Sequence, residues 1–355
     1  MTPVTGLPID RRDGRLKVTG HARYAAEFDI DNLAHAVLVQ STVSRGTIAG
    51  FDLAAAKAVP GVLAILTPDN APHLAPNQSG APGNVVAFPL LQDNTTDYNG
   101  QHIAVVVADT LERAQYAAAL VKVSYQEGEA AVRMADALAE AYPPKHFRNG
   151  SRPPDSRRGH PDAAWDAAPI RLDLTYTTPV EHHNPMEPHA TIALWDSDRL
   201  TVYSATQGID ASQHTLATLF GLKPEQVRVI CPFVGGGFGC KGVTWPHVAL
   251  TAMAARQVGR PVKLVLTRAQ MYTSNGYRPQ TIQHLRIAAS PDGHLQGLRH
   301  EVLAQMSQPV IGEFAEPAGL ISEMLYACPN VAVTHRLVPL NMPLPTFMRA
   351  PGEAS

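Results

Sequence analysis

Cysteine is scarce in this sequence: only Cys231, Cys240 and Cys328 occur among 355 residues. An odd, widely spaced set of this kind excludes a disulfide framework, and without a CxxC spacing it provides neither a zinc nor an iron–sulfur site. Long apolar runs are also missing, because none reaches the roughly 18 residues that cross a membrane. The polar N-terminus lacks the apolar segment of a secretory signal. We therefore expect a protein without a membrane span, folded in a reducing compartment.

A surplus of charge of either sign is absent too. The 31 acidic and 29 basic residues give a net charge of −2, which offers no attraction to nucleic acid or to an anionic membrane. With 45% hydrophobic and 17% charged residues, the composition is typical of a well-buried globular protein. A chain of 355 residues predicts two or more units, and its 30 prolines argue against a helix bundle.

The first third of the chain alternates strand and helix patterns. Apolar runs predict strands at 33–41, 61–67 and 102–109, and the last is continuous enough to be buried on both faces. Further predictions are a short helix at 52–59, a helix at 111–121 capped by Thr110, and a strand at 121–127. We interpret the whole chain as an N-terminal extension (1–17), an α/β unit (18–130), a proline-rich linker (131–165) and a second unit (166–355).

The second unit carries both kinds of pattern as well. Its predicted helices are 211–221, closed by Gly221, and 246–258, which begins with Pro246 at a favoured first position. The fold class is therefore mixed, α+β or α/β. Strands are predicted at 170–179, 190–196, 199–207, 226–234 and 261–267.

Glycine is concentrated in one stretch, "CPFVGGGFGCKGVTWPH", between a predicted strand and a predicted helix. That arrangement can cradle phosphates with free amides. The P-loop pattern fails because Gly242 follows Lys241, and GxGxxG fails because Cys240 stands where its last glycine would be. The pattern alone leaves a tight structural turn and a cofactor-binding loop equally open.

Three more motifs accompany the glycine stretch: "SATQG" (204–208), "EHHNPMEPHATIALW" (181–195) and "FMRAPGEAS" (347–355). Together they resemble the large molybdenum-binding subunit of the xanthine dehydrogenase/aldehyde oxidase family of molybdenum hydroxylases, most of all bacterial aldehyde oxidoreductase subunits. Residues 18–130, near "KVTGHARYAAE", resemble the small α/β hammerhead domain of that family. The resemblance implies a hammerhead-like domain followed by the first part of a molybdopterin-binding domain.

The resemblance also implies a cofactor, molybdenum held by a molybdopterin, which in bacteria is often the cytosine dinucleotide form. The family's proteins supply few or no direct ligands to the metal. Gln207 matches a glutamine whose neutral amide contacts an oxygen ligand of molybdenum; its other interpretation is a strand-end residue that caps a turn. Phe238 would line the substrate side of the pocket, and Phe238 and Arg349 would lie near the metal. The cofactor-binding residues implied are Gln207, Gly208, Gly236, Gly237, Phe238, Gly239, Arg349 and Ala350.

Four polar residues of the second motif invite a catalytic or metal-binding interpretation. His182, His183 and His189 lack the spacing of a helical zinc pair, so we expect them to be hydrogen-bonding residues of turns and core. Glu187 occupies a family-typical acidic position. We interpret it as a structural residue that binds backbone amides around the cleft, in preference to a catalytic base.

Two departures from the family's purine-oxidising members bear on the substrate. Those members carry a glutamate after the loop's lysine, where this chain has Gly242, and an aromatic residue two positions after the arginine, where it has Pro351. With Phe238, these two residues line the expected substrate pocket. A roomier, less polar pocket favours a small aldehyde over a purine, and an N-heterocycle such as an isoquinoline-like ring is the alternative.

The reaction that the resemblance implies is hydroxylation with water as the oxygen source. Electrons would pass to 2Fe-2S and FAD centres on an iron–sulfur subunit and an FAD subunit. The family's base is a glutamate in the C-terminal part of the subunit, which this sequence does not include, so no catalytic residue is predicted here. We expect part of a longer or split subunit, or a non-catalytic fragment. Its location would be cytoplasmic, or periplasmic if a partner carries the export signal.

Overall fold

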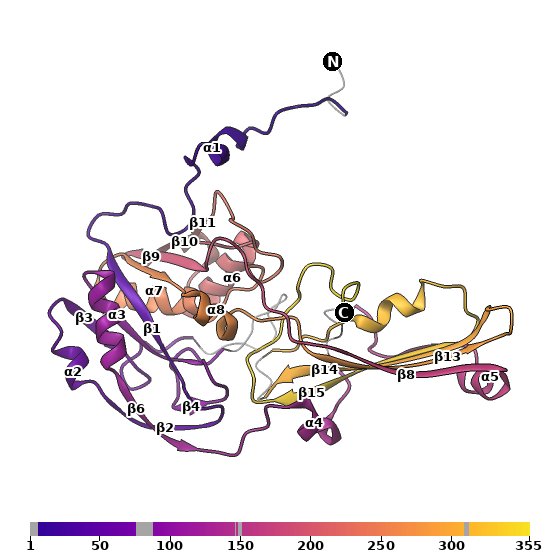
Figure 1. Ribbon diagram of the computed structural model, residues 1–355. Helices are drawn as coiled ribbons and strands as arrows, with labels where there is room; N and C mark the ends of the chain where they lie inside the picture. Colours follow the sequence, from indigo (N-terminus) through magenta and orange to yellow (C-terminus); the bar gives the residue numbers. More distant parts are fainter. Residues whose placement is uncertain (1–5, 76–87, 146, 148–150, 309–311) are drawn as a thin grey trace.

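The computed structural model describes residues 6–75, 88–145, 147, 151–308 and 312–355 (Figure 1). Its largest sheet has seven strands in the order β11-β10-β9-β12-β1-β5-β3. Strands β1 and β12, and likewise β10 and β11, pair in parallel, and the other neighbours are antiparallel. The strands are β1 (Ala34–Gln40), β3 (Val62–Leu66), β5 (His102–Ala108), β9 (Ala190–Asp196), β10 (Arg199–Ser204), β11 (Val227–Ile230) and β12 (Val262–Val265).

This sheet joins the two sequence units into one layer. Strands β1, β3 and β5 come from the first unit, whereas β9 to β12 come from the second, and they meet where Ala36 pairs with Leu264. Strand β5 is buried at every position, as its continuous apolar run predicts. Helix α3 (Leu111–Leu120) follows it, and the Thr110 side chain caps the helix by accepting a hydrogen bond from the Arg113 amide at 3.3 Å.

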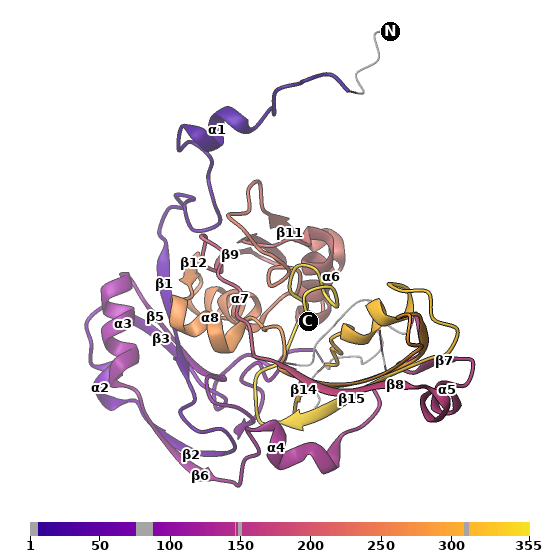
Figure 2. The same cartoon turned by 45° about the vertical axis from the view of Figure 1, so that its right-hand side comes forward.

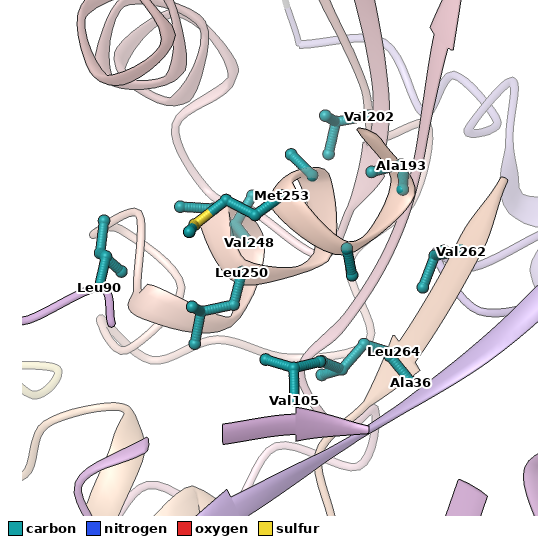
Figure 3. Packing of buried hydrophobic residues seen from close by; sticks show 14 of the residues in the cluster. Ala36, Leu90, Val105, Ala193, Val202, Val248, Leu250, Met253, Val262 and Leu264 are labelled. Atoms are coloured by element: carbon teal, nitrogen blue, oxygen red, sulfur yellow. The ribbon is translucent and has the colours of Figure 1, made fainter. Parts of the chain in front are cut away.

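Helix α7 (Pro246–Val258) lies in the main hydrophobic core of the molecule. Residues 246–255 are all buried, and the helix begins with Pro246 and ends at Gly259, whose φ of 62° suits a left-handed C-cap. Figure 3 shows Leu250 and Met253 among side chains from the strands beneath. Burial of each such side chain contributes about 1.5–3 kcal/mol, so α7 fixes the position of the glycine loop that precedes it.

A second sheet lies beside the first and has the order β7-β15-β14-β13-β8. Helix α5 (Pro161–Ala167) packs on β14, where the Ala164 methyl group lies close to Gly297. A small third sheet, β4-β2-β6, belongs to the first unit. Their strands are β7 (Ser156–Arg158), β8 (Ile170–Thr178), β13 (Thr281–Ala289), β14 (Leu295–Ser307), β15 (Val331–Leu340), β2 (Gly46–Asp52), β4 (Thr95–Thr96) and β6 (Lys122–Glu127).

The remaining helices are short, with one exception. Helix α6 (Ile209–Phe220) has twelve residues and ends at Gly221 in the left-handed conformation, as its sequence predicts. Helix α1 belongs to an N-terminal arm that extends from the body in Figure 1, and within the described ranges no helix is long and apolar enough to cross a membrane. The others are α1 (Gly14–Val18), α2 (Ala54–Lys57), α4 (Met134–Ala137), α8 (Arg268–Ser274), η1 (Leu138–Glu140), η3 (Pro224–Gln226) and η4 (Ala318–Glu323).

The mixed helix-and-sheet class is confirmed, and several element ends differ from the predictions. Strand β11 stops at Ile230 and not at residue 234, since Pro232 has no amide to give a ladder. The segment 131–165, predicted as a linker, contains α4, η1, β7 and the first part of α5. The domain boundaries themselves stay a prediction, although one sheet crosses them.

The C-terminal segment, residues 341–355, leaves the end of β15 and runs between the two sheets. Figures 1 and 2 both place the C-terminus there, in the region of α6 and the second sheet. The Arg349 amide donates a hydrogen bond to the Phe238 carbonyl at 2.8 Å, so this segment touches the glycine loop directly. The fold thus brings together two motifs that lie more than a hundred residues apart in sequence.

Candidate functional site

The glycine loop connects β11 to α7, and its glycines make room for other parts of the same chain. A Cβ on Gly235 would lie 2.4 Å from the Glu187 Cβ, and one on Gly237 would lie 2.5 Å from the Gln207 Oε1. Gly239 has a φ of 111°, and a Cβ there would lie 2.3 Å from the Phe347 carbonyl oxygen. Three separate motifs therefore converge on this loop because it lacks side chains.

Gln207 follows β10 and is held from both sides. Its backbone amide donates to the Lys241 carbonyl at 2.7 Å. Its side-chain Oε1 accepts from the amides of Gly239, at 3.1 Å, and Lys241, at 3.3 Å. The Nε2 group has no acceptor among the described residues, and the residue is exposed. Because the oxygen is fixed by the loop, the amide can present only its N–H donors outward.

The tip of the loop offers backbone donors beside that amide. No described residue accepts a hydrogen bond from the amides of Gly236, Gly237 or Phe238, and the last has a φ of 54°. The Phe238 side chain is 46% exposed, which suits a pocket wall. Successive backbone amides without an acceptor in the described chain are the kind of group that can bind an anion.

A buried ion pair stabilises the loop from below. The Lys241 side chain is fully buried, and its Nζ lies 2.7 Å from the Glu187 Oε2 and 3.0 Å from the Glu187 carbonyl. The same carboxylate accepts from the Gly235 amide at 2.7 Å, and its other oxygen accepts from the Ala25 amide at 3.4 Å. The prediction that Glu187 binds backbone amides is therefore confirmed.

The arginine motif forms the facing wall. Arg349 is exposed and its guanidinium has no described partner, while Ala350, with a φ of 60°, leaves its amide unbonded within the described chain. The carbonyls of Met348, Arg349 and Ala350 accept hydrogen bonds from one buried side chain, Arg278. The backbone amide of Arg349 thus joins this exposed arginine to the loop at the Phe238 carbonyl.

Two of the three histidines nearby contact backbone carbonyls. Nε2 of His183 lies 3.2 Å from the Phe347 carbonyl, and Nε2 of His189 lies 3.4 Å from the Cys240 carbonyl. His182 stacks against Tyr272. Burial lowers the pKa of His189 to about 3, which keeps that ring neutral. In the part of the chain that the structure describes, no three His, Cys, Asp or Glu side chains could together bind a metal ion.

Three predicted residues have their own intramolecular contacts. The Gly208 amide donates to the Thr206 hydroxyl at 3.0 Å, so it is not a free donor. The Gly242 amide donates to the Gly239 carbonyl at 2.9 Å, and a Cβ at 242 would lie 3.1 Å from the Phe347 Cζ. Pro351 is half-buried in the turn after Arg349. The Phe347 ring therefore fills part of the space that a longer side chain at 242 would need.

Taken together, the site presents hydrogen-bond donors that have no acceptor among the described residues and one exposed cation, Arg349, while the exposed Glu353 lies four residues further along the chain. The donors are the Gln207 side-chain amide and the amides of 236–238 and 350. Such a donor set favours a ligand that is anionic and rich in acceptor oxygens. A pterin-bound oxo-metal group meets these conditions.

Comparison with known proteins gives the same result. The family model for the molybdopterin cofactor-binding domain matches residues 140–355, and the model for the aldehyde oxidase and xanthine dehydrogenase a/b hammerhead domain matches 19–129. The chain belongs to the molybdenum-binding subunits of the aldehyde oxidase and xanthine dehydrogenase family. The expected hammerhead and molybdopterin-binding parts are thereby confirmed.

Individual relatives show how far the likeness extends. The Escherichia coli (strain K12) aldehyde oxidoreductase molybdenum-binding subunit PaoC is 40% identical over 99% of this chain and 46% of that protein. The Eubacterium barkeri nicotinate dehydrogenase large molybdopterin subunit is 29% identical over 96% of this chain and 80% of that protein. The aldehyde oxidoreductase structure from Desulfovibrio gigas aligns with a TM-score of 0.79, 25% identity and coverage of 96% of this chain and 39% of its own. The chain thus spans about half the length of PaoC.

Four residues that shape the candidate site could not be predicted from the sequence. Lys241 is the buried partner of Glu187, and the Phe347 ring lies against Gly242. Arg278 and Glu316 are two buried charged residues that hold residues 348–355. The position of Lys241 within a glycine-rich stretch is the one feature of the sequence that could indicate a buried charge. Arg278 and Glu316 lie in ordinary contexts, and only the fold brings them to the motif.

Proposed function

We propose that this chain is the molybdenum-cofactor-binding subunit of an enzyme that hydroxylates aldehydes to carboxylic acids, with water as the oxygen source. The cofactor would be molybdopterin, in the cytosine dinucleotide form, and electrons would leave to 2Fe-2S and FAD centres on partner subunits. Assembly would take place in the cytoplasm, with export only if a partner carries the signal. When bound, the cofactor supplies an electrophilic metal centre that accepts two electrons from the substrate carbon.

One observation carries the proposal: three separate motifs meet at the glycine loop. The loop's amides bind the Gln207 Oε1, the amides of 236–238 have no acceptor among the described residues, and the Arg349 amide is bound to the Phe238 carbonyl. These residues would hold the oxygen-rich periphery of the cofactor, and Phe238 would wall the substrate side. Gly208 is proposed only as the N-cap of α6 that directly follows Gln207, since its amide is bonded internally.

The aldehyde preference rests on Gly242 and Pro351. Neither supplies a group that could hydrogen-bond or stack on a purine, and the Phe347 ring lies against Gly242. The resulting wall is apolar, which suits an aldehyde with an aromatic or aliphatic body. PaoC, 40% identical over nearly the whole chain, is described as an aldehyde oxidoreductase subunit, which supports this choice.

The base that activates water is proposed to lie outside this chain. Glu187 is bound by Lys241 and by backbone amides, so it cannot approach a substrate without breaking a buried ion pair. Glu353 is exposed, and we do not propose it as the base, because it lies in the turn after Arg349, where the resemblance to the family implies a small residue. We expect the chain alone to be inactive even when cofactor is present.

The test is a substrate comparison on the complex assembled with its companion subunits. We expect oxidation of benzaldehyde at a kcat/KM at least about a hundredfold above that for xanthine, a difference of about 2.7 kcal/mol in transition-state binding. A second test is the variant Gln207→Glu, which replaces a neutral donor by an anion. We expect this variant to lose molybdenum without unfolding. Xanthine turnover equal to that of benzaldehyde would refute the substrate assignment, and retained molybdenum in Gln207→Glu would refute the site.

A second candidate keeps the same site but changes the substrate to an N-heterocycle. The observation that favours it is the nicotinate dehydrogenase subunit from Eubacterium barkeri, 80% of which is covered by this chain. A nicotinate or quinoline ring is flat but needs fewer hydrogen bonds than a purine, so an apolar wall at Gly242 admits it. Including nicotinate and quinoline in the same assay separates the two candidates, because a clear preference for a heterocycle selects the second.

A further inference from the structure

The turn that carries Arg349 has an unusual backbone. Ala350 has a φ of 60° and Gly352 a φ of 85°, so two residues within three positions adopt the left-handed conformation. For alanine this conformation costs roughly 1–2 kcal/mol, and it persists only where surrounding contacts impose it. The turn therefore requires an external constraint, and its own sequence provides little.

Arg278 provides that constraint. It lies between α8 and β13, is only 4% exposed, and reaches the turn from the buried side. Its Nη2 donates to the carbonyls of Arg349 at 2.7 Å, Ala350 at 3.4 Å and Met348 at 3.5 Å. Its Nη1 reaches the carbonyl of Ala354 at 3.4 Å and the Glu181 carboxylate at 3.0 Å. One guanidinium thus gathers four carbonyls of a seven-residue segment.

A buried carboxylate binds hydrogen-bond donors of the same turn. Glu316 is 0% exposed, and its Oε1 accepts from the Gly352 amide at 2.7 Å and from the Ser355 hydroxyl at 2.5 Å. The carbonyls of the turn are therefore bound by a cation and one of its amides by an anion. With its carbonyls bound in this way, the turn keeps the Arg349 amide on the Phe238 carbonyl and the Ala350 amide free.

We propose that Arg278 is a positioning residue for the cofactor pocket. By binding the carbonyls of 348–350, it keeps their negative ends off an anionic ligand and leaves the Arg349 guanidinium and the Ala350 amide to face that ligand. The inference rests on the proposed function, because it takes the ligand to be the anionic molybdenum cofactor. A lysine is a poor replacement for Arg278, because a single ammonium cannot bind the carbonyls of 348–350, as Nη2 does, and at the same time the Ala354 carbonyl and the Glu181 carboxylate, as Nη1 does.

The test compares Arg278→Lys with Arg336→Lys in the assembled enzyme. Arg336 is the matched control, since it also forms a two-pronged pair with a carboxylate, Asp155, but at a partly exposed position away from the turn. Hydrogen exchange of residues 348–354 is measured in cofactor-free protein, together with molybdenum content and steady-state kinetics after loading. Thermal unfolding and circular dichroism verify that each variant is folded.

In Arg278→Lys we expect exchange at 348–354 to be about tenfold faster or more, as loss of charge-assisted hydrogen bonds implies. Molybdenum content should fall, and kcat per bound molybdenum should fall about tenfold while KM changes little, because the turn no longer places Arg349. Arg336→Lys should leave all three unchanged. A folded Arg278→Lys protein with wild-type exchange and wild-type molybdenum content overturns the proposal.

Glu181→Gln covers the case in which Arg278→Lys fails to fold. The Glu181 side chain is half-exposed and contacts only Nη1 of Arg278, so its amide variant should fold and still weaken the binding of Arg278 to the turn. We expect faster exchange at 348–354 in this variant, and exchange identical to wild type also overturns the proposal. If the wild-type enzyme binds no molybdenum, the proposed function fails, whereas the exchange measurement still reports on Arg278.

Discussion

Two neighbouring glycines of the loop are needed for different reasons. A Cβ on Gly237 would meet the end of the Gln207 side chain, which can move, and the backbone of Gly237 is in an ordinary conformation. A Cβ on Gly239 would meet the backbone carbonyl of Phe347, and its φ of 111° excludes most other residues. The first glycine therefore places the side chain of Gln207, which is proposed to bind the cofactor, and the second permits the fold.

We expect Gly237→Ala to impair function without unfolding the protein. The new methyl group displaces Gln207 from the amides of Gly239 and Lys241, so its N–H donors no longer face the pocket. Turnover should fall by about one to two orders of magnitude, as for loss of a transition-state donor, while the unfolding free energy changes by less than about 1 kcal/mol. Steady-state kinetics and urea unfolding measure the two quantities.

Gly239→Ala is the counterpart. Because the clash is with backbone and φ is positive, we expect a loss of stability of about 2 kcal/mol or more. If Gly237→Ala is as destabilising as Gly239→Ala, the distinction between the two glycines is wrong.

At the residue level, sequence motifs predicted the residues whose roles are local. Gln207, Glu187 and Phe238 lie in or next to recognisable strings, and the structure brings them together. The donor geometry of Gln207 and the closeness of Phe347 to Gly242 could not be predicted, because both depend on where a segment from another part of the chain lies. Arg278 could not be found for the same reason.

Among the structural elements, the glycine loop is held by a buried ion pair. It has no regular secondary structure between β11 and α7, and the Lys241–Glu187 pair ties its second half to the segment before β9. Both charges are withdrawn from water, so each requires the other.

We expect Lys241→Met to destabilise the protein by about 3–5 kcal/mol, because it leaves the Glu187 carboxylate buried and unpaired. Glu187→Gln combined with Lys241→Met should recover part of that loss. Urea unfolding of the wild type, both single variants and the double variant gives the coupling free energy.

The exposed pair Arg133–Asp136 is the control, and Arg133→Ala should cost less than about 1 kcal/mol. Strictly additive effects at 241 and 187 would show that the pair does not stabilise the loop.

Element boundaries were predictable where the chain carries a terminating residue. Pro246 and Gly259 delimit α7, and Gly221 ends α6, because each residue's backbone preference acts locally. The interpretation of 131–165 as a linker overlooked α5, whose stability comes from packing on β14 and not from its own sequence. Strands β13 to β15 lay beyond the last predicted strand and form most of the second sheet.

For the whole molecule, buried histidines predict a response to acid. Burial lowers the pKa of His102 to about 4 and of His189 to about 3, and lowers the pKa of His247 well below its ordinary 6.5. Below pH 6.5 the unfolded chain binds protons at these sites and the folded chain does not. Stability is therefore full above pH 6.5 and lost as the pH falls toward about 4.

Each of these histidines should contribute up to about 1.4 kcal/mol of lost stability per pH unit below 6.5. Urea unfolding at pH 7.0, 6.0 and 5.0 measures how the free energy of unfolding changes with pH. The variant His102→Gln should reduce this slope by the amount that corresponds to about one bound proton. A free energy of unfolding that is constant over this range would contradict the buried, neutral state of these histidines.

The central sheet has a consequence for the order of events during synthesis. Ala34 in β1 pairs with Val262 in β12, about 230 residues later. At typical translation rates of roughly 5–20 residues per second, β1 waits on the order of ten to fifty seconds for this neighbour. Until then an edge with unpaired amides and carbonyls is open on the ribosome, where it can pair with other chains. The nascent first unit is therefore the stage at which a chaperone would matter most.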